Sequence, residues 1–166
     1  YLLLRGFVGA CGDSEFALRC LSAILGVVAV ALCARLAARE AGQAVHAAGH
    51  SAGRSAGQSA SRWAAWAAAT APLLWWASGE ARMYSLMATL ALCCALAWRR
   101  LRHVRPARAD WLALGAGELA LLYTHNTGPI AAAWLNAVTV LAWARDRRAA
   151  LPAWRPWLVS QAAVLL

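Results

Sequence analysis

The stretch Ser78-Gly79-Glu80-Ala81-Arg82-Met83-Tyr84-Ser85 places two opposite charges and a tyrosine between two long uncharged runs. Trp63 to Ala77 and Met83 to Trp98 contain no Asp, Glu, Lys or Arg. At a rise of about 1.5 Å per residue, each run is about long enough to cross a bilayer if flanking side chains snorkel. The pattern predicts two membrane-crossing helices joined by a charged turn.

The composition of the whole chain is that of a membrane protein. Of its 166 residues, 62% are hydrophobic, and the mean hydropathy is +0.52. An ordinary soluble domain is less apolar than this. Because the chain begins with Tyr1 and ends within the apolar run from Val159 to Leu166, we expect a fragment of a longer protein, truncated at both ends.

All 16 basic side chains are Arg, and their placement predicts a topology. Thirteen lie in alternate segments between the apolar runs, which the positive-inside rule assigns to the cytoplasm. Arg5, Arg19 and Arg82 lie on the opposite side. The charge is therefore a topology signal, and no nucleic-acid partner is predicted. The thirteen are Arg35, Arg39, Arg54, Arg62, Arg99, Arg100, Arg102, Arg105, Arg108, Arg145, Arg147, Arg148 and Arg155.

These patterns predict an all-α fold, a polytopic bundle of transmembrane helices in one membrane domain over 1–166. Residues 1–15 are predicted to form an interfacial segment on the outer surface. Residues 37–62 contain an Ala-Gly-x-Ser repeat and predict a flexible cytoplasmic loop, because such a composition cannot bury a core. The predicted crossings are 16–36, 63–77 (kinked at Pro72), 83–98, 111–123, 130–144 and 157–166.

The start of the first crossing carries capping signals. Asp13 or Ser14 can accept hydrogen bonds from the free N–H groups of the first turn. Glu15 and Arg19 are four residues apart in the favourable order for an ion pair. These residues are expected to be structural.

Four polar residues at the predicted outer ends are candidate substrate-binding residues: Glu80, Arg82, Tyr84 and His125. If Ser78 caps the helix over 83–98, Glu80 lies in its first turn, where the helix dipole favours an anion. Arg82 in the same turn is unfavourable unless an anion such as phosphate binds there. The alternative is that Arg82 pairs with Glu80 or with a lipid headgroup.

Glu118 lies in the middle of the predicted crossing over 111–123, seven residues before His125. A carboxyl at this depth costs a few kcal/mol unless it is neutral, paired or facing water. We expect Glu118 to be mainly a packing residue bonded to a neighbouring crossing. The alternative is a proton relay with His125, which could itself be an acid–base group, a phosphate contact or a helix cap.

No metal site is predicted from the sequence. The five Cys show no metal-ligand spacing. A glycine-rich phosphate loop, a HExxH pair and a nucleophile elbow are also absent from the sequence.

Three motifs, taken in order along the chain, resemble those of GT-C membrane glycosyltransferases. Gly12 to Arg19, followed by Leu21 to Gly26, is similar to the entry of a crossing in that group. Ser78 to Leu86 resembles its outer-loop Glu-Ala-Arg-Met-Tyr motif, and Thr124 to Asn126 is similar to a Thr-His-Tyr. The relatives are the protein O-mannosyltransferase, aminoarabinose transferase and Rgt-type lipopolysaccharide glycosyltransferase group.

The resemblance implies transfer of a sugar from a polyprenyl-phosphate donor to a lipid, glycan or protein acceptor. The site would face the periplasm from the bacterial inner membrane. The family's catalytic base is an acidic residue expected upstream of this fragment, so the catalytic residue is unknown here, as is any divalent metal. Beyond the lipid-linked donor, no cofactor is assigned. The alternative is a multi-span transporter or flippase subunit in which Glu118 and His125 relay protons.

Overall fold

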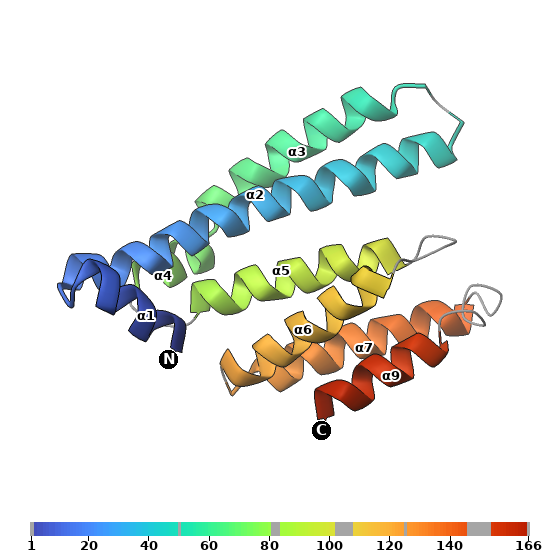
Figure 1. Cartoon of the computed structure of the whole chain (residues 1–166). Coiled ribbons are helices and arrows are strands. Elements are labelled where there is room, and N and C mark those ends of the chain that lie inside the picture. The colour runs from blue at the N-terminus through green and yellow to red at the C-terminus, as the bar shows by residue number, and fades with distance from the viewer. Residues whose placement is uncertain are drawn as a thin grey trace. The chain divides into compact units, whose positions relative to one another are not determined.

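The computed structural model describes residues 2–49, 51–80, 84–101, 108–124, 126–145 and 154–165. All regular structure in these ranges is α-helical, with no strand (Figure 1). The predicted all-α class is therefore confirmed. The chain divides into two compact units, Tyr1–Thr89 and Leu90–Leu166, and α5 (Tyr84–Leu101) begins in the first and ends in the second.

The two longest helices of the first unit before α5, α2 and α3, pack against each other and run antiparallel (Figure 1). Its helices before α5 are α1 (Leu2–Cys11), α2 (Glu15–Ala47), α3 (Gly53–Thr70) and α4 (Pro72–Gly79). α2 begins as the sequence predicts, because the backbone N–H of Ala17 donates to the Ser14 hydroxyl at 3.2 Å. Arg19 and Glu15 form the predicted ion pair at 2.6 Å.

The expected flexible loop over 37–62 is instead largely helical. α2 continues to Ala47 and α3 starts at Gly53, so only a short connection separates them. The Ala-Gly-x-Ser repeat places a small residue at every fourth position, on one side of a helix. A Cβ atom added at Gly57 would lie 2.8 Å from the Ala38 carbonyl oxygen. The repeat therefore allows two backbones to approach closely, where its composition had suggested a linker.

The predicted crossing over 63–77 is divided between two helices. α3 ends at Thr70, Ala71 is extended with ψ 118°, and Pro72 opens α4. Proline suits this first helical position because its missing N–H would have no intrahelical partner there. The predicted kink at Pro72 is thus a break between α3 and α4.

The second unit contains the end of α5 and three further described helices. These are α6 (Arg108–Thr124), α7 (Gly128–Arg145) and α9 (Trp154–Leu165), and α6 packs against both of the others. The Trp98 indole N–H donates to the Thr139 hydroxyl at 2.6 Å, which joins α5 to α7. Helices thus lie over the predicted ranges 83–98, 111–123, 130–144 and 157–166, within the described residues.

One described helix, α2, is long and apolar enough to cross a membrane. Its most apolar 18-residue window has a mean hydropathy of 2.3 and is 18% buried. Gly128–Ala142 in α7 is also apolar but shorter. By itself a single such helix is weak evidence, because a core helix of a soluble protein or a signal sequence near the N-terminus has the same length and composition.

Candidate functional site

The connection between α4 and α5 contains most of the predicted site. Glu80 and Tyr84 are both described and both half-buried. Arg82 and His125 lie outside the described residues. The structure therefore describes the two ends of the charged segment, Glu80 and Tyr84.

Glu80 ends α4, contrary to the expectation that it belongs to the first turn of the next helix. Its backbone N–H donates to the Trp76 carbonyl oxygen at 3.2 Å, and its own backbone is extended. Ser78 lies inside α4, where its hydroxyl donates to the Trp75 carbonyl oxygen at 2.8 Å. A carboxylate at the C-terminal end of a helix gains nothing from the helix dipole. The helix dipole therefore does not stabilise the Glu80 carboxylate at this position.

Two contacts join the end of α4 to the start of α5. The rings of Trp76 and Tyr84 lie 5.2 Å apart between centroids and are tilted by 34°, within the range of favourable aromatic pairs. The Ser85 hydroxyl donates to the Ala77 carbonyl oxygen at 2.7 Å, and Ser85 is 1% exposed. The end of α4 and the start of α5 therefore contact each other directly.

The hairpin made by α4 and α5 is also tied to α2. The Thr89 hydroxyl lies 3.0 Å from the Leu25 carbonyl oxygen and 2.8 Å from that of Ser85. A Cβ atom added at Gly26 would lie 2.7 Å from the Ser78 Cβ. The C-terminal part of α4 therefore packs closely against α2.

A second group of polar side chains lies between α6, α7 and α9, with Glu118 buried and the other members half-buried. We call it the Glu118 cluster, made of Glu118, Asn136, Trp157 and Gln161. Gln161 Nε2 donates to Glu118 Oε2 at 2.6 Å. Asn136 Nδ2 lies 3.1 Å from Gln161 Oε1 and 3.4 Å from Glu118 Oε1. Trp157 Nε1 donates to Asn136 Oδ1 at 2.9 Å. Asn136 is therefore the centre of the cluster.

The Glu118 cluster joins three helices through one buried carboxyl. Glu118 is 1% exposed, and its two oxygens face amide donors from α7 and α9. We identified Glu118 from the sequence but missed the other three members. The available signal was that Asn136 and Gln161 are polar residues within apolar runs.

In the described ranges, no group of three or more His, Cys, Asp and Glu side chains is arranged to hold a metal ion. What the α4–α5 connection offers chemically is one carboxyl group and one phenol at the ends of a charged segment. Such groups can hydrogen-bond sugar hydroxyls or orient a substrate. Comparisons with protein-family models, with curated proteins and with solved structures found no match.

Proposed function

We propose that this chain is part of a membrane glycosyltransferase of GT-C type. The enzyme would move a sugar from a polyprenyl-phosphate donor to a lipid, glycan or protein acceptor at the outer face of the bacterial inner membrane. The observation that carries the proposal is the Glu-Ala-Arg-Met-Tyr motif of the sequence, together with the contacts that join its two flanking helices, Trp76 to Tyr84 and Ser85 to Ala77.

Exposed apolar side chains support the membrane setting. Val27 is 71% exposed, Leu73 73% and Ile130 69%. Large apolar side chains exposed singly are common in soluble proteins, but many of them over several helices indicate an apolar surrounding. Others are Phe16, Trp63, Trp66, Trp75, Leu112, Trp134, Leu141 and Val159. A polytopic helical bundle would place these side chains against lipid.

In this proposal the donor's phosphate lies at the headgroup level of the outer leaflet. Arg82 would bind it, because a guanidinium matches phosphate oxygens with two parallel hydrogen bonds. Glu80, Tyr84 and His125 would contact the sugar or the phosphate. The acceptor hydroxyl needs a carboxylate to take its proton, and the leaving phosphate needs positive charge nearby. The resemblance assigns that base to an acidic residue after the family's first crossing, and no residue of this sequence is given the role.

The transporter alternative depends on Glu118 as a proton carrier. In the Glu118 cluster its oxygens face the amides of Gln161 and Asn136, groups that do not exchange protons near neutral pH. This arrangement favours a structural role for Glu118, and with it the transferase.

Sugar transfer from a polyprenyl-phosphate donor, normalised to folded protein in detergent, tests the proposal in the full-length protein. Arg82→Ala should weaken donor use about ten- to a hundredfold, since it removes a charge-assisted phosphate contact. Arg82→Lys should fall between Ala and the parent, because it keeps the charge but loses the planar fork. Arg19→Ala, an exposed residue paired with Glu15, is the matched control and should stay within twofold. Unchanged donor dependence in Arg82→Ala would refute the phosphate site.

The topology has its own test. Reporter fusions after Arg62, Arg108 and Arg148 should indicate the cytoplasm, and fusions at Gly79 and Thr127 the exterior. A cytoplasmic signal at Gly79 would overturn both the topology and the location of the site.

A further inference from the structure

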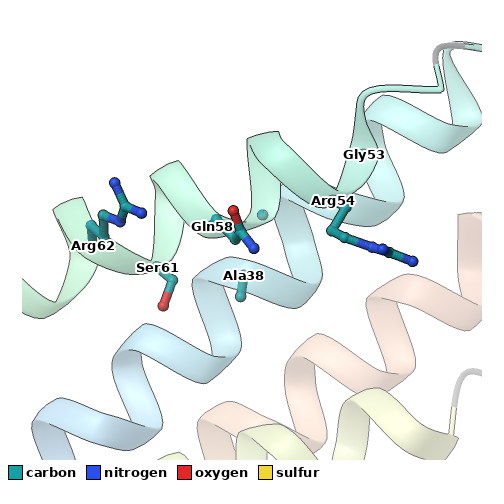
Figure 2. A pocket seen from close by; sticks show the side chains of 7 residues that line it. Ala38, Gly53, Arg54, Gln58, Ser61 and Arg62 are labelled. Atoms are coloured by element: carbon teal, nitrogen blue, oxygen red, sulfur yellow. The ribbon is translucent and has the colours of Figure 1, made fainter.

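A surface hollow of about 520 Å³ runs along the α2–α3 hairpin (Figure 2). Small residues form its floor, among them Ala38 and Gly57, and four side chains that can donate hydrogen bonds line it. These are Arg54, Gln58, Ser61 and Arg62, all on α3. No carboxylate lines the hollow, so its charge is positive throughout.

Three of these donors lie on the same side of α3 as an exposed tryptophan. Arg54, Gln58, Arg62 and Trp66 are four residues apart in succession, so they share a helix face. All four are exposed, and Trp66 is 69% exposed and its neighbour Trp63 75%. Among the described residues, neither Arg54 nor Arg62 has an ion-pair partner. Cations next to exposed Trp are typical of a membrane interface.

We infer that this hollow binds the headgroup of an anionic phospholipid of the cytoplasmic leaflet, with Arg62 as its main cation. The inference rests on the proposed membrane topology, in which the crossing starts at Trp63 and Arg62 lies at headgroup depth. Basic pockets on the cytoplasmic side of membrane helices bind such headgroups. Gln58 and Ser61 supply neutral donors for the phosphate and glycerol oxygens.

The geometry favours an extended anionic group over a single small anion. Figure 2 shows the side chains of Arg54 and Arg62 reaching away from each other, with Gln58 between them along α3. Eight residues of helix separate the two Arg by about 12 Å. Arg54 thus lies about one Debye length beyond Arg62 from the membrane. The two Arg should therefore contribute unequally, with Arg62 the stronger.

Arg35 provides a matched control on the facing helix. Gly53 lies against Gly42, and Gly57 lies against Ala38, so the antiparallel register puts Arg35 level with Ala60. Arg35 is exposed and does not line the hollow. Arg35 therefore carries the same charge as Arg62 at a similar distance from the proposed membrane surface, but it lies away from the hydrogen-bond donors of the hollow.

Thermal unfolding of the full-length protein in neutral detergent, titrated with phosphatidylglycerol, tests the inference. Phosphatidylglycerol should stabilise the parent in a saturable way, and phosphatidylcholine or inorganic phosphate should do so far less. Arg62→Gln should weaken the apparent affinity for phosphatidylglycerol about fivefold. Arg54→Gln should weaken it about twofold, and Arg35→Gln by less than that. If Arg62→Gln lowers the yield of folded protein, Ser61→Ala serves in its place and should also weaken the affinity.

Any one of four results would overturn the inference. Equal losses in Arg35→Gln and Arg62→Gln would mean diffuse surface charge without a site. Equal stabilisation by phosphatidylcholine, or full stabilisation by inorganic phosphate, would exclude recognition of an anionic lipid. A larger loss in Arg54→Gln than in Arg62→Gln would indicate an acidic segment of a partner protein farther from the membrane. Sugar transfer, measured on the same variants, should be unchanged, so the two proposals can fail separately.

Discussion

In the α2–α3 hairpin the helices meet through glycine and alanine, whereas α6, α7 and α9 meet through four hydrogen-bonded polar side chains. At Gly57 the backbone of one helix approaches the Ala38 carbonyl of the other. In the Glu118 cluster, by contrast, Asn136 connects side chains from all three helices. Both devices suit helices in lipid, where burial of apolar surface does not drive association.

The two contacts should fail in different ways. The glycine contact depends on the absence of side-chain volume, so it should tolerate changes of polarity and be sensitive to added atoms. The Glu118 cluster depends on matched donors and acceptors, so it should tolerate an isosteric amide and be sensitive to truncation. Substitutions that change only the volume of a side chain, or only its polarity, should therefore affect the two contacts differently.

The largest effect is expected for Gly57→Val. Even a Cβ atom at this position lies 2.8 Å from the Ala38 carbonyl oxygen, and that backbone can move only if the helices separate. Overpacking of this kind costs about 1–3 kcal/mol. Thermal unfolding and proteolysis of the hairpin in detergent should both detect it.

Gly9→Val is the matched control for Gly57→Val. Gly9 is also within a helix, and a Cβ there meets no atom within 4 Å. The change in helix propensity is the same at both positions. Helix propensity slightly favours Val over Gly, so an equal change of stability in the two variants would show that the close approach to Ala38 has no effect at Gly57.

An intermediate effect is expected for Asn136→Ala. The substitution leaves the Trp157 indole N–H without its acceptor and removes a donor from Glu118 and Gln161. Such losses cost about 1–3 kcal/mol in soluble proteins, but membrane proteins average about 0.6 kcal/mol per bond. We therefore expect about 1 kcal/mol, measured by thermal unfolding. Asn126→Ala, an exposed residue in a turn, should cost less; an equal cost would argue against the cluster.

The sequence predicted helices better than it predicted contacts. Uncharged runs and capping residues located the helices, because both signals are local. The hairpin was missed because an Ala-Gly-x-Ser repeat has the composition of a linker, and only the register of Gly57 on Ala38 shows its use. The partners of Glu118 were missed because they lie 18 and 43 residues away, with no local signal linking them. Arg82 and His125 lie outside the described residues, so their roles remain predictions.

The smallest effect is expected for Glu118→Gln, which also separates the two candidate functions. Glutamine has the shape of glutamate and keeps one acceptor oxygen for Gln161 Nε2, which lies 2.6 Å from Glu118. Its NH2 group replaces the oxygen that accepts the long bond of 3.4 Å from Asn136 Nδ2, so only that weak bond is lost. Asn136 remains bonded to Gln161 Oε1, and the three helices stay joined. We expect a loss of stability below about 1 kcal/mol and most sugar-transfer activity retained in the full-length protein. Glu118→Ala is the contrasting variant: it removes the acceptor of Gln161 Nε2 and should cost more stability. Near-complete loss of activity in Glu118→Gln, with normal unfolding, would show that the negative charge itself is needed. That result would favour the proton relay over the packing role.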